Sequence, residues 1–93
     1  MKLGVFLSEW RENEEILGRL KAEKIGVFLV ENAVYHAVIK SPLIEKQNRD
    51  YYVLTEDLQT RGFTACDVDN INVVTYDNLV DLMMNDYEKL IWL

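Results

Sequence analysis

Cysteine and histidine are almost missing from this 93-residue chain, which has one of each, Cys66 and His36. A lone cysteine cannot form a disulfide within the chain. A metal site needs several converging nitrogen or sulfur ligands, and these two residues do not supply them. We therefore expect neither a metal nor another cofactor. The first residues also lack the charged and apolar segments of a secretion signal, so we expect a cytoplasmic protein.

Glycine, long apolar runs and basic residues are also scarce. None of the four glycines lies in a cluster of the kind that holds a phosphate before a helix, so nucleotide binding is not predicted. The longest apolar runs, residues 3–7 and 25–30, are far shorter than the roughly 20 residues of a membrane span. The 10 basic residues are outnumbered by 16 acids, and the net charge of −6 argues against direct binding to nucleic acid.

Apolar residues nevertheless make up 49% of the chain and fall into short blocks. Residues 3–7 and 25–30 are apolar at consecutive positions, which is typical of strands covered on both faces in a parallel sheet. Between them, residues 8–23 begin with a favourable N-cap, Ser8, and carry apolar side chains at helical spacing. A strand, a helix and a strand at this spacing indicate a right-handed parallel crossover. The glycine within each strand is expected to let a helix approach closely.

The second half of the chain continues this alternation. We therefore predict an α/β fold, a three-layer α/β/α sandwich with a mostly parallel five-stranded sheet, as a single domain over residues 1–93. Ligand sites of such sheets lie at the carboxyl ends of the strands. The later elements expected are helices at 33–39, 55–62 and 76–87 and strands at 51–54, 71–74 and 89–92. The apolar side of the last helix is predicted to consist of Leu79, Val80, Leu82 and Met83.

The short helix predicted after the third strand carries the clearest local signals. Thr55 is expected to be its N-cap, with Glu56 and Asp57 in the first turn. Arg61 follows Asp57 by one turn, and Gly62 is expected to end the helix in a left-handed conformation. Capping and one charge pair explain each of these residues without a substrate. The segment is either purely structural or fixes a helix that partners touch.

Large aromatic side chains are more numerous than a small domain easily buries. Such residues anchor protein interfaces because they are large and partly polar. Association with another subunit, or between copies of the chain, is one interpretation; the alternative is that the same side chains fill the core. The interface candidates are Tyr35, Tyr51, Tyr52 and Trp92.

Cys66 is the single candidate for a catalytic side chain. It lies in a predicted loop beside Asp67 and Asp69, whose charges would raise the thiol pKa and disfavour the reactive thiolate. An ordinary loop cysteine and a redox or sulfur-handling cysteine both fit this pattern. His36 is more typical of a partly buried helix residue than of a general base.

Three stretches of the sequence are similar to the DsrH/TusB family of small sulfur-relay subunits. The first is an apolar strand followed by polar residues at the strand end, Glu31 and Asn32. The second, the most specific, is a strand followed by an acidic pair, an apolar residue and Arg-Gly. The third is the strand from residue 71 with the helix after it, closing with an Ile-Trp pair. The residues of these motifs at the rim of the sheet are Glu31, Asn32, Glu56, Asp57, Arg61 and Gly62.

This resemblance implies a DsrE/F/H-type fold and a place in sulfur transfer, where a persulfide passes between cysteines of partner proteins. Partners of the DsrE/TusD and DsrF/TusC types are implied, and the DsrE/TusD type carries the principal active cysteine. The destination is the 2-thiolation of wobble uridine in tRNA or related sulfur metabolism. Some H-type subunits have a cysteine in their N-terminal part, whereas residues 1–65 here have none.

The sequence therefore predicts a largely non-catalytic subunit of a cytoplasmic sulfur-relay complex, acting mainly in assembly. Two alternatives stay open. One is a sulfurtransferase that uses Cys66 as persulfide carrier. The other is a self-associating α/β domain with no part in sulfur chemistry.

Overall fold

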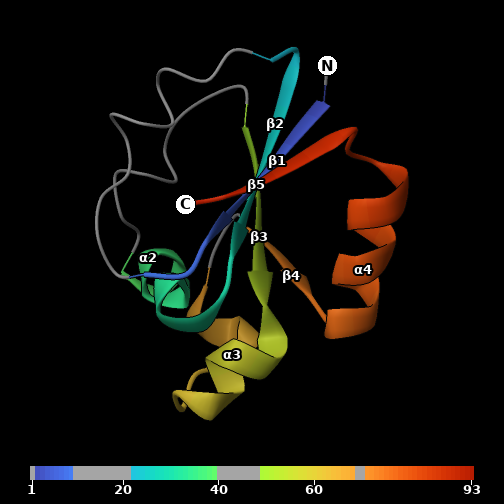
Figure 1. Cartoon of the computed structure of the whole chain (residues 1–93). Coiled ribbons are helices and arrows are strands. Elements are labelled where there is room, and N and C mark those ends of the chain that lie inside the picture. Colours follow the sequence, from blue (N-terminus) through green and yellow to red (C-terminus); the bar gives the residue numbers. More distant parts are fainter. Residues whose placement is uncertain (1, 10–21, 40–48, 69–70) are drawn as a thin grey trace.

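A computed structural model describes residues 2–9, 22–39, 49–68 and 71–93 of the chain. Its centre is a five-stranded sheet with the strand order β4-β3-β2-β1-β5, and all neighbouring strands are parallel (Figure 1). This confirms the predicted parallel sheet. The strands are β1 (Lys2–Leu7), β2 (Lys24–Leu29), β3 (Arg49–Leu54), β4 (Asn72–Val74) and β5 (Lys89–Trp92).

Within the described residues, short helices follow β2, β3 and β4. The predicted helix at 33–39 is found as a 3-10 turn that continues into α2, and the last helix ends two residues earlier than predicted. Most of the helix predicted at 8–23 lies outside the described residues. The helical elements are η1 (Glu31–Val34), α2 (Tyr35–Val38), α3 (Thr55–Thr60), η3 (Ala65–Asp67) and α4 (Tyr76–Asn85).

The strand order determines which helix covers which face. The chain moves from β1 to β4 in one direction, and then returns across the sheet to place β5 on the far side of β1. Because parallel crossovers are right-handed, the returning connection lies on the opposite face from the others. Accordingly, α4 lies on one side of the sheet and α2 on the other (Figure 1). The three-layer α/β/α arrangement is thus confirmed.

Each face of the sheet has its own buried cluster. Successive side chains of a strand point to opposite faces, so Phe28 belongs to the α4 side and its neighbours Val27 and Leu29 to the α2 side. The α2 side also buries Leu58 of α3. The α4 side buries Leu79. Buried apolar residues of β1, β2 and β3 thus hold helices on both faces.

The glycines of β1 and β2 leave room for one aromatic ring. A Cβ atom at Gly26 would collide with the ring of Tyr87, which follows α4, and one at Gly4 would lie 2.6 Å from Cδ2 of Leu90. The helix predicted to approach these glycines does not itself make the contact. Side chains that follow α4 do so, the ring of Tyr87 over Gly26 and Leu90 of β5 beside Gly4.

One part of the predicted apolar face of α4 is wrong. Leu79 is buried, and Leu82 and Met83 are half-buried, but Val80 is 38% exposed. The helix lies over the middle of the sheet. The side of α4 that carries Val80 does not contact a strand closely enough for Val80 to be buried. Among the described residues, no helix is long and apolar enough to cross a membrane.

Candidate functional site

The predicted rim residues gather where β2 and β3 end. Asp57 accepts a hydrogen bond through Oδ2 from the backbone N–H of Glu31, at 2.6 Å. Arg61 donates from Nε and Nη2 to Oδ1 of Asn32, at 3.1 and 2.9 Å. Its Nη1 also donates to the backbone carbonyl of Asp57, at 3.1 Å, and lies 4.0 Å from Oδ1 of that residue. These contacts join η1 to the start of α3.

The acidic pair of α3, Glu56 and Asp57, therefore links α3 to neighbouring elements of the fold. The prediction that Thr55 is the N-cap is wrong: the N-cap position is Leu54, and no side chain caps the helix there. Strand β3 runs directly into α3, which leaves no extended residue at Thr55 to serve as a cap. Glu56 instead accepts a hydrogen bond from the backbone N–H of Tyr76 at the start of α4, at 3.1 Å. Gly62 has φ +83°, which confirms the predicted left-handed end.

Glu31 has an unusual backbone for a residue with a side chain. Its φ is 49°, in the left-handed region, which costs an L-residue roughly 1–2 kcal/mol. The hydrogen bond from its N–H to Asp57 holds this conformation. The turn ends β2 abruptly and places Glu31 at the carboxyl edge of the sheet, where parallel α/β sheets bind ligands.

The α4 face of the sheet carries a row of stacked aromatic rings. Trp92, Phe6, Phe28 and Tyr52 occupy one register position across β5, β1, β2 and β3. The successive ring centroids are 5.0, 4.9 and 5.0 Å apart, all in stacked geometry. The rings of Phe28 and Tyr52 are covered and buried, but Trp92 at the edge is 61% exposed. The aromatic row thus runs from the core to the surface.

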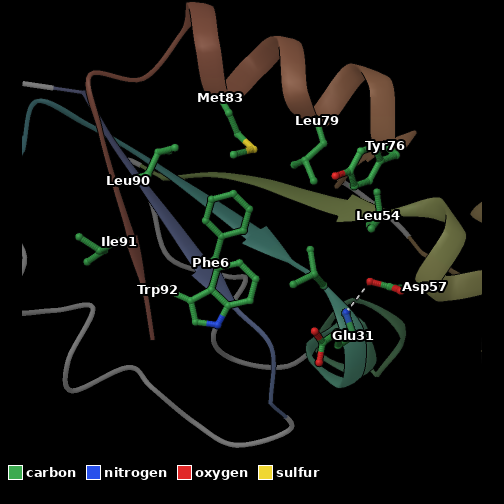
Figure 2. A pocket seen from close by; sticks show the side chains of 11 residues that line it. Phe6, Glu31, Leu54, Asp57, Tyr76, Leu79, Met83, Leu90, Ile91 and Trp92 are labelled. Carbon is green, nitrogen blue, oxygen red and sulfur yellow. Dashed lines mark hydrogen bonds between the residues drawn. The ribbon is translucent and has the colours of Figure 1, made fainter.

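An apolar groove of about 490 Å³ lies beside α4, over the exposed end of this row. Its apolar walls come from α4, β1 and β5, and its end at the carboxyl edge holds Glu31 and Asp57 (Figure 2). The direction in which successive strands are added to the sheet reverses between β1 and β5. Such a point is the usual location of a binding crevice in parallel sheets. The apolar lining is Phe6, Val30, Leu54, Tyr76, Leu79, Met83, Leu90, Ile91 and Trp92.

The apolar surface continues onto α4 itself. Tyr76, Val80 and Met84 are 59%, 38% and 77% exposed. They are four residues apart, so they share one side of the helix. Because Tyr76 lines the groove, this side of α4 borders the groove. Exposed apolar residues that cluster in this way mark interaction sites more often than scattered ones do.

The four interface candidates divide between the core and the surface. Tyr51 and Tyr52 are 6% and 8% exposed, so the structure supports the alternative that they fill the core. Tyr35 is half-buried, with its ring edge-on to Phe63 at 5.7 Å between centroids. Of the four, Trp92 presents the largest exposed aromatic surface to a partner.

Cys66 and His36 lie away from the groove lining. Cys66 is exposed in η3, and its backbone N–H donates to Oγ1 of Thr64. Asp67 accepts a hydrogen bond from the Thr64 N–H at 2.8 Å, which completes a capping box for this turn. His36 lies within α2 and is 2% exposed, so it is more deeply buried than the partly buried helix residue predicted. Within the described part of the chain, no cluster of side chains could hold a metal ion.

Among the titratable groups of the described residues, Tyr87 is the one whose pKa the fold shifts clearly. Burial raises the pKa of its hydroxyl far above the ordinary value of 10.0, and the hydrogen bond that it donates to Tyr52 raises this pKa further. Both effects favour the neutral phenol. The ring lies on the sheet at Gly26 and stacks edge-on against Phe28, so it serves the core and not the groove.

Sequence reasoning missed two features of this site. The Asn32–Arg61 contact follows from the adjacency of β2 and β3, whose carboxyl ends meet at one edge. The groove follows from the position of β5 beside β1, together with apolar residues repeated every four positions on α4. The second signal is present in the sequence, but helical spacing places Val80 on the same apolar side of α4 as the buried Leu79.

Comparisons with known proteins identify the family through a family model and the fold through solved structures. The family model described as DsrH like protein matches residues 8–89. A search of curated proteins found no match. The chain is similar to the solution structure of protein Tm0979 from Thermotoga maritima, with a TM-score of 0.67 and 20% identity, covering 89% of this chain and 93% of that one. It is also similar to MTH1491 from Methanobacterium thermoautotrophicum, described as a protein of unknown function, with a TM-score of 0.71 and 14% identity, covering 99% and 98%.

Proposed function

This chain belongs to the DsrH-like family, and from that membership we propose that it is a subunit of a sulfur-relay complex that acts mainly through assembly. The family implies a role related to sulfur relay, and its members are generally subunits of complexes with DsrE- and DsrF-like partners. The proposed partners are therefore a DsrE/TusD-like and a DsrF/TusC-like protein in the cytoplasm. The proposed destination of the sulfur is wobble uridine in tRNA or a related acceptor.

The observation that carries this proposal is the half-covered face of the sheet. Five strands spaced about 4.8 Å apart span roughly 19 Å, whereas one helix with its side chains is about 10–12 Å wide. Among the described elements, α4 alone covers this face, and it leaves the side over β1 and β5 open. Partly exposed aromatic and aliphatic side chains line the opening, and a partner subunit would bury them.

The acidic character of the chain fits a subunit that leaves RNA binding to its partners. Phosphate contacts require clustered basic residues, and the chain has a net charge of −6. An assembly role also fits the position of Cys66, which does not line the groove. Sulfur would then pass between cysteines of the partners, with this subunit shaping their complex.

Co-expression tests the assembly role. The chain is produced with the DsrE-like and DsrF-like proteins of the same genome, and the mixture is analysed by size exclusion and native mass spectrometry. We expect one complex containing all three chains. A matched variant, Met84→Lys, places a charge on the exposed apolar side of α4 and should reduce assembly while leaving the isolated chain folded. Recovery of the chain alone, in the presence of well-folded partners, would contradict the proposal.

Cys66 as a persulfide carrier is the second candidate, because its thiol is exposed. In that reaction the Cys66 thiolate attacks the terminal sulfur of a donor persulfide, the donor S–S bond breaks, and the donor leaves as a thiolate. Intact mass measured after incubation with a persulfide donor decides between the two roles. A mass increase of one sulfur atom that Cys66→Ser abolishes would establish the carrier. An unmodified chain, under conditions that load a known carrier, would support the assembly role.

A further inference from the structure

The groove beside α4 is chemically different at its two ends. Along its length the walls are apolar, with Phe6 and Trp92 from the sheet and Met83 from α4. At the carboxyl edge it ends in two acids, Glu31 and Asp57 (Figure 2). Among the described residues, no lysine or arginine lines it. A bound molecule therefore meets apolar surface first and negative charge at one end.

The two acids are not equally available. Asp57 already accepts the Glu31 N–H, and its other oxygen faces Arg61. Glu31 is exposed, and its carboxylate makes no hydrogen bond or ion pair with any described residue. Glu31 is thus the charge at this end that a bound group could pair with.

Glu31 is also held at the groove against a conformational cost. Its left-handed backbone would suit glycine better, yet the residue carries a charged side chain. Strained backbone of this kind concentrates at binding sites, where the surrounding contacts maintain it. Here the Asp57 carboxylate provides that contact. Strain and free charge therefore coincide at one residue of the groove.

The shape of the groove favours a few side chains of a partner over other occupants. Its volume falls within the range of about 300–1,000 Å³ that is typical of ligand sites. However, its outer wall includes Leu90 and Trp92, which are 39% and 61% exposed, so it would not enclose a small molecule. A second copy of the chain would bring another net charge of −6 to an acidic site.

We propose that this groove binds a short segment of a partner protein in which a large apolar residue is followed by arginine or lysine. The apolar side chain packs on Phe6 and Trp92, and the basic side chain pairs with Glu31. This inference rests on the proposed function as a complex subunit and specifies the chemistry of the partner that the subunit recognises.

Two blocked peptides test the proposal on the full chain. One is Gly-Leu-Trp-Arg-Gly, and the other carries Glu in place of Arg. Backbone amide shifts are followed by NMR during titration. We expect the Arg peptide to shift amides of β5 and of the segment around Glu31, and to bind about two- to fivefold more tightly than the Glu peptide, as one exposed charge pair allows. High salt should remove this preference and leave the apolar contribution.

Three variants assign the interaction to its residues. Glu31→Gln should bind both peptides equally, because it keeps the side-chain size and loses the charge. Asp81→Asn removes a charge from the other side of α4, where Asp81 lines a separate surface hollow, and should keep the full preference. Trp92→Ala should weaken both peptides. A dispersed spectrum of each free variant establishes that it is folded.

Several results would overturn the proposal. They are an absence of shifts in the groove, equal binding of the two peptides by the unmodified chain, or a preference that survives Glu31→Gln. Concentration-dependent shifts of the same amides without peptide would identify a second copy as the occupant. Failure here with successful co-assembly would leave the proposed function in place and move the contact elsewhere. Peptide binding without co-assembly would support the groove as a binding site and contradict the proposed function.

Discussion

At the scale of single residues, Gly26 and Tyr87 decide how closely the end of α4 packs on the sheet. The ring of Tyr87 occupies the space of a Cβ atom at Gly26. We expect Gly26→Ala to lower the free energy of unfolding by about 1–3 kcal/mol, because an added methyl group overpacks this contact. Urea denaturation measures the effect. In a Tyr87→Leu background the same change should cost less, and an equal cost in both backgrounds would show that the ring is not the cause.

Tyr87 also links stability to alkaline pH. Burial raises its pKa in the folded chain, so the folded state keeps the phenol proton at a pH where the unfolded state has lost it. The contribution of the Tyr87 hydroxyl to the free energy of unfolding is therefore complete below about pH 10. Above that pH it decreases by about 1.4 kcal/mol per pH unit. We expect Tyr87→Phe to reduce this alkaline slope, measured by urea denaturation between about pH 9 and pH 11.5. Parallel profiles of the two proteins would mean that the hydroxyl is hydrated in solution.

At the scale of elements, the contact between η1 and α3 explains the Glu-Asp and Arg-Gly motif. Asp57 and Arg61 join Glu31 and Asn32 across two neighbouring strand ends. We expect Asp57→Ala to destabilise the chain by about 1–3 kcal/mol, because it leaves a donor without its charged acceptor. Asp57→Asn retains an oxygen for the Glu31 N–H and should cost less. Chemical denaturation of the three proteins provides the comparison.

The same variants show whether this motif also serves assembly. If Asp57→Ala and Arg61→Ala destabilise the chain but leave complex formation unchanged, the motif is purely architectural. A loss of assembly beyond the loss of stability would place the η1–α3 edge in the interface.

The ends of the helices give a second test at this scale. Thr75 caps α4 by accepting a hydrogen bond from the N–H of Asn78, at 3.3 Å, whereas Thr55 caps nothing. We expect Thr75→Ala to lower the midpoint of thermal unfolding through a loss of about 1 kcal/mol. Thr55→Ala should change stability by less than about 0.5 kcal/mol. If Thr55→Ala proved more destabilising than Thr75→Ala, Thr55 would act as the helix cap that the sequence predicted.

At the scale of the whole molecule, the strand order predicts how stability is distributed. β1 and β2 have neighbours on both sides and are buried at nearly every position, whereas β4 and β5 are edges. Hydrogen exchange should therefore be slowest for amides in the middle of β1 and β2, and faster by orders of magnitude in β4, which has only three residues. Slow exchange throughout β5 in the isolated chain would indicate that its open edge is already covered in solution.

The prediction of the fold from sequence succeeded where local signals and sheet geometry agreed. Consecutive apolar residues in β1 and β2 indicated buried parallel strands, and Gly62 marked a helix end. The assignment of Thr55 was wrong because a cap requires an extended backbone, and local sequence does not reveal that β3 runs straight into α3. Val80 was misplaced because helical spacing identifies an apolar side of α4 but not how much of that side the sheet reaches.

The sequence by itself determined the alternation of apolar strands with short helices, and with it a parallel sheet covered on both faces, because buried strand patterns and crossover handedness leave few other arrangements. Only the tertiary structure decided that β5 lies beside β1. That position leaves part of the α4 face open, extends the aromatic row to Trp92, and places Glu31 at the end of an apolar groove. The physical reason is that strand order depends on packing between segments far apart in the chain, which no local pattern of residues specifies.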